Sequence, residues 1–406
     1  MRAYERLIRY IAYDTVSDEN STQTPSTACQ WDLALALKAE MREMGMQDVG
    51  VDDHAYVYGR IPATPGYENC TKIGFIAHLD TVSTGKRGAS PYRIVPAYDG
   101  GSVPLGDSGL SLQPEMFPHL HTLVGQTLIV TDGTMVLGAD DKAGIAEILT
   151  LCEKLLQSDK PHGSISVCFP PDEEIGHGAA LMDLERFDAS LAYTLDGSAA
   201  GEIEYETFNA ALAKWEIEVV AVHPGTAKDV MVNAAAVAAE IDRMLPEEER
   251  PRYTQGHEGF YHLTDIGGDV SRAFAQYIIR DHDSERFARR KETMRAIEGR
   301  INEKYGAGTA KLTLADQYRN MAEVIADHPE TMEAARAAIK AAGLTPHSEP
   351  VRGGTDGAQL SFRGLPCPNL GTGGYAYHGP YEHVTVEGMD KAVEILEGIV
   401  DWFARR

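Results

Sequence analysis

Long apolar runs are missing from this sequence. No stretch approaches the roughly 18 consecutive apolar residues from which a membrane-spanning helix is built. Residues 1–6 also lack the apolar centre of a signal peptide and are typical of the start of an amphipathic helix. We therefore expect a protein without a membrane partner.

Positive charge is scarce. The chain has 37 lysines and arginines against 61 aspartates and glutamates, which gives a net charge of -24. Nucleic acids and anionic membranes are bound through clustered basic side chains, so this balance argues against both as partners. It favours a small solute instead.

Cysteines are few and scattered. There are five, an odd number, and no two form a Cys-x-x-Cys pair. This pattern argues against a disulfide framework and is typical of a reducing cytoplasm, where we expect the protein to reside. Cys168 lies in a strand-like apolar run and is expected to be buried.

Strand-like and helix-like segments alternate along the first half of the sequence. Up to about residue 196, strand-like apolar runs alternate with amphipathic helices, which is typical of an α/β layered domain. The expected strands are 72–77, 164–169 and 191–195, and the expected helices are 32–44 and 142–157. From 208 to 320, strand-like residues 213–222 precede a helix at 230–244, and strands at 261–266 and 273–279 precede a helix at 284–305.

A chain of 406 residues is long for a single core, so two domains are expected. We predict an α/β catalytic domain with a mixed sheet from residues 1–207 and 321–406, completed by helices at 329–342 and 388–405. Residues 208–320 form an inserted, smaller α+β domain.

Acid and imidazole side chains follow or interrupt several apolar runs, which is where α/β folds place their chemistry. These residues are His78, Asp80, Asp140, Glu173, Glu174, Asp196 and His378. Each cluster alone has an ordinary explanation: His-x-Asp is common, Glu-Glu is usually solvated, and Asp141 suits the first turn of a helix. Their conjunction favours a site for two metal ions.

The residue types fit such a site. A pair of divalent ions needs a carboxylate that bridges them, and an imidazole and a further carboxylate for each ion. With Asp140 as the bridge, one ion can be completed by His78 and Asp196, and the other by Glu174 and His378. Asp80 lies two residues beyond His78 and is expected to accept its imidazole N–H. Glu173 is left over and is suited to act as a general base.

The motifs resemble those of a known family. The segments are Ala77-His78-Leu79-Asp80-Thr81, Leu137 to Ala146, Asp172-Glu173-Glu174-Ile175-Gly176, His223 to Lys228 and Arg352-Gly353-Gly354-Thr355-Asp356-Gly357. In this order they look like the dinuclear zinc exopeptidases related to carboxypeptidase G and acetylornithine deacetylase. They are most similar to the peptidase T group, the tripeptide aminopeptidases of bacteria.

The resemblance implies two zinc ions per chain, for which cobalt or manganese could substitute. It implies the same five ligands as the argument from residue types: His78, Asp140, Glu174, Asp196 and His378. Asp80 is again the orienting acid and Glu173 the catalytic base. The insert would be a lid that can also form a homodimer.

Four further residues are candidates for substrate contact. The loop at Arg352 lacks the Gly-Lys-Ser/Thr ending of a phosphate loop, and its arginine suits a substrate carboxylate, as in the resembling family. A lone histidine such as His223 is more often structural, but the resemblance implies that it polarises the scissile carbonyl. Arg280 is a weaker candidate, and capping is the simpler explanation for Asn233.

The expected reaction is hydrolysis of an amide bond in a small peptide, with Glu173 passing a proton from water to the leaving amine. Cleavage of tripeptides after the first residue is implied by the resemblance alone. A carboxypeptidase or N-acyl amino acid deacylase with the same metals, and a non-catalytic regulatory relative, remain alternatives. Residues 84–118 are poor in helix and form either a surface excursion or a wall of the substrate cleft.

Overall fold

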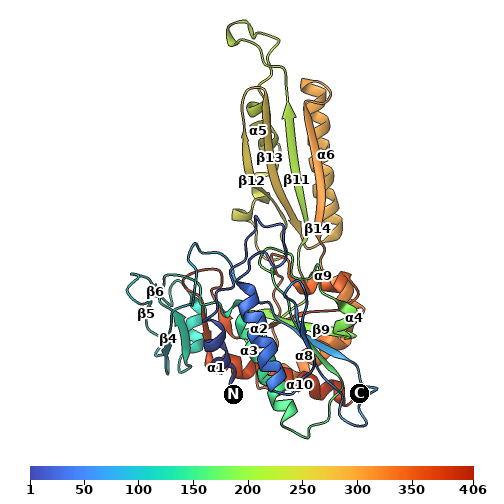
Figure 1. The fold of residues 1–406 in the computed structure, drawn as a ribbon. Coiled ribbons are helices and arrows are strands. Elements are labelled where there is room, and N and C mark those ends of the chain that lie inside the picture. Colours follow the sequence, from blue (N-terminus) through green and yellow to red (C-terminus); the bar gives the residue numbers. More distant parts are fainter. The chain divides into compact units, whose positions relative to one another are not determined.

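The computed structural model describes residues 1–406, which fall into two compact units (Figure 1). The first unit comprises residues 1–205, 323–349 and 355–406, and the second comprises residues 206–322 and 350–354. Residues 350–354 thus belong with the second unit, although they lie well beyond its main segment in the sequence.

The first unit is built on a mixed sheet of seven strands. Their order is β1 (Gln47–Val51), β2 (Val57–Ile61), β8 (Ile165–Phe169), β3 (Ile73–Ile76), β9 (Leu191–Gly197), β15 (Asn369–Gly371) and β10 (Ile203–Glu204). The central strands β8, β3, β9 and β15 are parallel, and their apolar side chains are almost all buried. Parallel strands end at one common edge, and this edge carries the candidate site.

Helices surround this sheet. They are α1 (Ala3–Tyr10), α2 (Gln30–Glu43), α3 (Ala139–Leu156), α4 (Leu184–Phe187), α7 (Ala322–Ala326), α8 (Pro329–Ala341), α9 (Asp356–Phe362) and α10 (Val386–Ala404). Helix α3 packs against β3, β9, α1 and α10, so its apolar residues are buried along its whole length. Side chains of α4 and α9 share one core cluster with Ile76, Cys168 and Ala192 of the sheet. Cys168 is buried, as predicted.

Residues 84–118 form part of a small β-rich layer within the first unit. Strand β4 (Tyr92–Val95) pairs with β7 (Leu128–Thr131), which continues to β17 (His383–Thr385) and β16 (Gly374–Tyr375). Strands β5 (Val103–Pro104) and β6 (Ser111–Leu112) form a hairpin, and a 3-10 helix, η1 (Pro118–Leu123), follows. Leu105, Leu112 and Leu120 are fully buried in a core cluster of this layer.

The second unit is an antiparallel four-stranded sheet with two helices. The strand order is β12 (Phe260–Gly268), β13 (Arg272–Asp281), β11 (Asn209–Glu218) and β14 (Ala310–Tyr318). Along β11, Ala213, Trp215 and Ile217 are buried against α5 (Ala234–Arg243) and α6 (Ser284–Tyr305), while the residues between them are exposed. Three short 3-10 helices lie at Pro224–Thr226, Glu247–Glu249 and Pro251–Tyr253.

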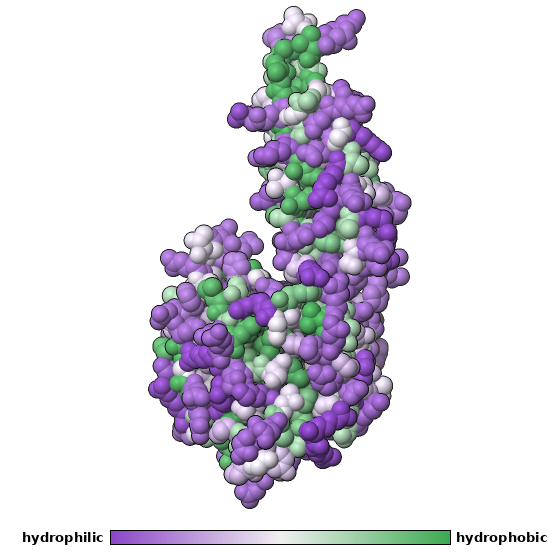
Figure 2. Space-filling model, turned by 90° about the vertical axis from the view of Figure 1, so that its right-hand side faces the viewer, coloured by the Kyte–Doolittle hydropathy of each residue, from purple (hydrophilic) through white to green (hydrophobic).

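These findings confirm the predicted α/β class with a mixed sheet. Strand β14 was not predicted, and β11 lies four residues earlier than the expected 213–222. Helix α5 begins at Ala234 rather than at 230, because the Asn233 side chain caps it there. None of the helices is both long and apolar enough to cross a bilayer. The face drawn in Figure 2 is mostly hydrophilic, with apolar residues in separate groups.

Candidate metal and catalytic site

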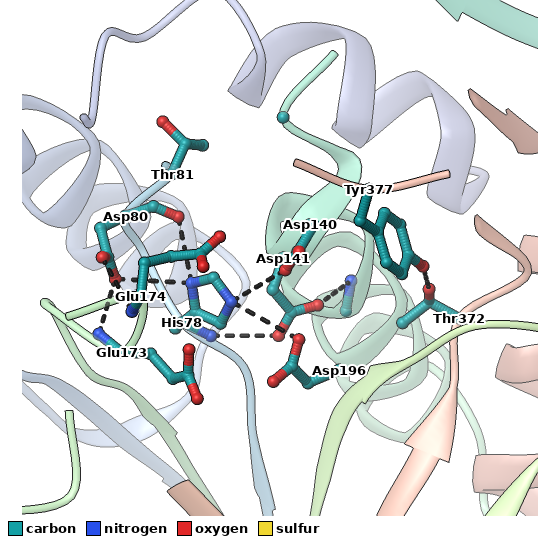
Figure 3. Close-up of polar contacts among 12 residues, drawn as sticks. His78, Asp80, Thr81, Asp140, Asp141, Glu173, Glu174, Asp196, Thr372 and Tyr377 are labelled. Atoms are coloured by element: carbon teal, nitrogen blue, oxygen red, sulfur yellow. Dashed lines mark hydrogen bonds and ion pairs between the residues drawn. The ribbon is translucent and has the colours of Figure 1, made fainter. Parts of the chain in front are cut away.

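Seven of the predicted site residues lie together in the first unit. Figure 3 shows all of them except His378. His78 and Asp80 follow β3, Glu173 and Glu174 follow β8, and Asp196 lies within β9. Asp140 enters from the start of α3, and His378 from the turn between β16 and β17. The common edge of three parallel strands therefore delivers five of the seven residues.

Asp140 lies at the centre of this group. Its Oδ1 is 3.0 Å from Nε2 of His78, and its Oδ2 is 3.0 Å from Nε2 of His378. His78 Nε2 is also 3.5 Å from Asp196 Oδ1, and His378 Nε2 is 3.1 Å from Glu174 Oε2. The two oxygens of one carboxylate thus face two separate imidazole–carboxylate pairs.

Asp80 holds its neighbours differently from the prediction. His78 Nδ1 lies 3.0 Å from the backbone oxygen of Asp80 and 3.4 Å from its carboxylate. The carboxylate instead accepts the backbone N–H groups of Glu173, at 2.9 Å, and of Glu174, at 3.3 Å. Because the carboxylate is committed to these amides, Asp80 aligns the imidazole chiefly through its carbonyl and fixes the two glutamates through its side chain.

Two buried acids at the site were missed by the sequence analysis as site residues. Asp141 accepts the backbone N–H groups of His78, at 3.1 Å, and of Gly144, at 3.2 Å. Its carboxylate lies close to the Asp196 carboxylate and to the imidazole of His78. Glu382 accepts the N–H groups of Gly138 and Asp140, both at 2.9 Å. Both acids therefore fix the backbone that presents Asp140 and His78.

His378 is held by a strained turn. Its φ of 62° lies in the left-handed region, which is unfavourable for a residue with a side chain. The preceding Tyr377 donates its hydroxyl to the carbonyl of Gly197, at 3.0 Å, and lies 2.8 Å from the hydroxyl of Thr372. Since Tyr377 precedes His378 and Gly197 follows Asp196, this hydrogen bond fixes the backbone of His378 relative to that of Asp196.

Carboxylates outnumber the imidazoles at this site, so the charges are only partly balanced within the protein. Burial raises the pKa of Glu174 to about 7 and that of Asp196 to about 6, and in both cases the charge of Asp140 adds to the effect. Burial opposes ionisation of Asp140 as well, but hydrogen bonds from His378 and His78 lower its pKa below the usual range. Glu174 Oε1 is buried and has no hydrogen-bond partner.

The residues fit metal ions. Two imidazoles and several crowded carboxylates, one with an orphaned oxygen, form a donor set of nitrogen and oxygen without thiolate. Zinc, cobalt and manganese are all bound by such donors, and their positive charge would offset the buried carboxylates. The excess of buried carboxylates over imidazoles therefore supports a metal site.

A cavity of about 590 Å³ opens beside Glu174 within the first unit. Ligand sites typically have volumes of roughly 300 to 1,000 Å³. It is lined by Val16, Ser17, Asp18, Glu19, Asn20, Thr27, Val82, Ser83, Gly85, Arg87, Glu174 and Ile175. Gly85 and Arg87 come from the 84–118 stretch, so the start of this stretch lines a cavity next to the site.

The other four candidates lie in the second unit. His223 is exposed and accepts the N–H of Gly225 on Nδ1 at 3.1 Å, and Asn233 Oδ1 caps α5 by accepting the N–H of Ala236 at 3.1 Å. Arg280 is buried and donates to the carbonyls of Ile279, at 3.0 Å, and Ala211, at 3.4 Å.

Arg352 is half-buried in the second unit. Its Nη1 donates to the carbonyls of Gly256, at 2.7 Å, and Glu258, at 2.8 Å, and its Nη2 donates to the hydroxyl of Thr254 at 2.8 Å. The guanidinium also lies over the ring of Phe208, 5.2 Å from its centroid. No carboxylate pairs with it within 4 Å, so its positive charge remains available to an anion.

The comparisons identify the class of protein. The sequence model described as Peptidase family M20/M25/M40 matches residues 128–402. The chain belongs to this family and is a metallopeptidase.

Within the family, relatives that match the whole chain carry the name Peptidase T. The chain is 49% identical over 406 residues to Peptidase T of Bacillus velezensis, a match that covers 99% of this chain and 98% of the relative. It is 48% identical over 406 residues to Peptidase T of Escherichia coli, with the same coverage. The resemblance drawn from the motifs is thereby confirmed.

Solved structures share the fold. Aminopeptidase PepT from Bacillus cereus superposes with a TM-score of 0.79 at 24% identity, covering 99% of this chain and 98% of that one. A tripeptidase from Staphylococcus aureus gives a TM-score of 0.78 at 21% identity, covering 100% and 98%.

Proposed function

We propose that this chain is an aminopeptidase that removes the first residue from tripeptides with the help of two zinc ions. The observation that carries the proposal is the position of Asp140, whose two oxygens face two separate imidazole–carboxylate pairs. A bridging carboxylate between two such pairs is the arrangement that a dinuclear site needs. The names of the relatives, Peptidase T, support the choice of a peptide substrate.

In this proposal His78 and Asp196 hold one ion, Glu174 and His378 hold the other, and Asp140 is shared. The ions would polarise the scissile carbonyl and lower the pKa of a water molecule, as pairs of divalent ions do in other hydrolases. Cobalt or manganese could take the place of zinc, because the donor set does not discriminate among them.

Glu173 is the proposed proton carrier. It stands next to Glu174 but forms no ion pair with either imidazole of the group. Its backbone N–H is fixed by Asp80 at 2.9 Å. A carboxylate that is held beside the ligands without being used by them can take a proton from water and deliver it to the leaving amine.

The second unit supplies the proposed substrate contacts and acts as the lid. His223 is exposed, and because its Nδ1 accepts a backbone N–H, its Nε2 is the nitrogen that carries a proton and can donate to the scissile carbonyl. Arg352 would bind the C-terminal carboxylate, with Arg280 as a further cation. Asn233 caps α5 through Oδ1, and its Nδ2 is the group that would donate to substrate.

A panel of amide substrates tests the proposal. The purified protein is loaded with zinc and given di-, tri- and tetrapeptides, a C-terminally amidated tripeptide and N-acetyl amino acids, and products are identified by mass spectrometry. We expect release of the first residue from tripeptides, and loss of this activity with a chelator. Hydrolysis of N-acetyl amino acids alone would make the protein a deacylase, release of the last residue would make it a carboxypeptidase, and inactivity with bound metal would support a regulatory role.

A further inference from the structure

Glu173 and Glu174 lie on a segment with no regular structure of its own. Residues 170–183 link β8 to α4 and form neither helix nor strand. The segment has turn hydrogen bonds of its own, such as that from the His177 N–H to the Asp172 carbonyl at 2.9 Å, but no regular ladder, so contacts from other elements also fix its path. One side is held by Asp80, which accepts the two glutamate N–H groups.

The other side of the segment is held by helix α9. Gln359 donates from Nε2 to the carbonyl of Gly176 at 3.2 Å. Arg363, at the end of the same helix, donates to the carbonyl of Ala179 and, at 2.7 Å, to that of Met182. Two side chains of α9 thus bind three carbonyls that recur at every third residue of the segment.

The contact from Gln359 is linked to Glu173 through a single residue, Gly176. Gly176 accepts the amide of Gln359 on its carbonyl and donates its own N–H to the carbonyl of Glu173 at 2.6 Å. Two hydrogen bonds therefore join α9 to the residue proposed as proton carrier. The contacts of Arg363 fix the same segment six and nine residues further on.

Apolar packing presses the two elements together. Leu360 of α9 is fully buried in one cluster with Ala179 and Met182 of the segment. Gly178 passes so close to Asp356, the first residue of α9, that a Cβ at this position would lie 2.2 Å from Asp356 Oδ2. The segment has no room to shift toward α9. Arg363, together with the Tyr58 hydroxyl that accepts the Asp183 N–H at 2.9 Å, prevents it from shifting away.

We propose that Arg363, assisted by Gln359, is a positioning residue for Glu173. By binding the carbonyls of Ala179 and Met182, Arg363 fixes the path of the segment and hence the place of the Glu173 carboxylate. Arg363 contacts none of the proposed ligands, so it acts only through the segment. The inference rests on the proposed function, in which Glu173 carries the proton.

The expected effect is on turnover rather than on binding. A displacement of a reacting group by about 1 Å can cost roughly 100-fold in rate. Asp80 still holds the Glu173 N–H when Arg363 is lost, so the displacement should be smaller than this. We therefore expect Arg363→Ala to lower kcat by roughly 10- to 30-fold and to leave KM within about twofold.

Three variants and a control test this role. Arg363→Lys should recover most of kcat, because an ammonium can still donate to one of the two carbonyls. Gln359→Ala, which removes one neutral hydrogen bond, should lower kcat by about threefold to fivefold. Arg336→Ala removes the same charge from an exposed position on α8 and should leave kcat unchanged. Each variant is assayed for kcat, KM, bound metal, melting temperature and the pH profile of kcat/KM.

The result that supports the proposal is a fall in kcat with unchanged KM and metal content, together with rescue by lysine. An unchanged kcat in Arg363→Ala, or a fall that only follows the folded fraction or the metal content, would overturn it. If Arg363→Ala does not fold, Gln359→Ala decides by the same criteria. If the wild type cleaves no tripeptide, the proposed substrate is wrong, and the variants are then compared on the amide that the wild type does hydrolyse.

Discussion

Arg352→Ala should remove the ability to distinguish a free C-terminus from an amidated one. A guanidinium has five N–H donors. In the structure two bonds from Nη1 and one from Nη2 go to Gly256, Glu258 and Thr254. Two donors remain, on Nε and Nη2, which is the number that a bidentate contact with a carboxylate requires.

The size of the effect follows from this contact. A hydrogen bond to a charged group is typically worth about 1.5 to 3 kcal/mol, or roughly 10- to 150-fold in kcat/KM. Arg352 is only half-buried, so solvent screening favours the lower end of this range, about tenfold. Arg352→Ala should thus lower kcat/KM for free tripeptides by about tenfold and should barely affect amidated ones.

The assay compares free and amidated forms of one tripeptide with wild type, Arg352→Ala and Arg252→Ala. Arg252 is an exposed arginine of the same unit, so its loss controls for the change in net charge. The wild type and the control should prefer the free peptide by about tenfold, and Arg352→Ala should show no preference. If the wild type cleaves both peptides equally well, Arg352 does not bind the C-terminal carboxylate of the substrate. The preference for tripeptides must then arise from cleft walls such as the 84–118 stretch.

Four further outcomes are expected. Glu173→Gln should keep both metals and lose roughly 100- to 10,000-fold in turnover, whereas Glu174→Gln should also release metal; substantial turnover in the former would exclude Glu173 as the base. Chelation should abolish activity without unfolding the protein, and elemental analysis of active enzyme should find two ions per chain rather than one or none. His223→Ala should lower turnover by about 100-fold with unchanged metal content, and a loss of metal instead would contradict its role at the carbonyl. Burial, with the neighbouring His119, lowers the pKa of His383 from 6.5 to about 4. Between these two pH values the unfolded state binds a proton on this imidazole and the folded state does not, so the free energy of unfolding should fall by up to about 3 kcal/mol as the pH drops between them. His383→Gln should make the free energy of unfolding, measured by urea denaturation, less dependent on pH in this range.

The sequence was informative where one local pattern determines one structural feature. Strands β3, β8 and β9 are short and almost wholly buried; His78 and the glutamate pair follow β3 and β8, and Asp196 lies near the end of β9. Since such runs form parallel strands with a common edge, the residues that follow them could be expected to meet. His378 was assigned through the count of metal donors and the family resemblance, because no pattern near it predicts which strand its turn faces.

The features that the sequence did not reveal depend on contacts between distant backbones. Glu382 binds two N–H groups more than 240 residues away in sequence, and no periodicity announces such a contact. Asp141 was assigned to helix capping, and it does accept the Gly144 N–H, but its second bond to His78 depends on the packing of α3 against β3. In strand β14, apolar Ala310, Leu312 and Leu314 alternate with Lys311 and Thr313, but the alternation does not continue through the rest of the strand.

The chain crosses between the two units four times, at 205–206, 322–323, 349–350 and 354–355. The second unit is therefore not a cassette that can be cut out at two points. A chimera that exchanges only residues 206–322 with a relative would combine a foreign loop with the native Arg352, whose guanidinium bonds to Gly256 and Glu258 of that loop. An exchange of lids between relatives must carry residues 350–354 along with the longer segment. A proteolytic fragment that ends before residue 350 lacks part of the second unit, including Arg352 and its hydrogen bonds to Gly256 and Glu258.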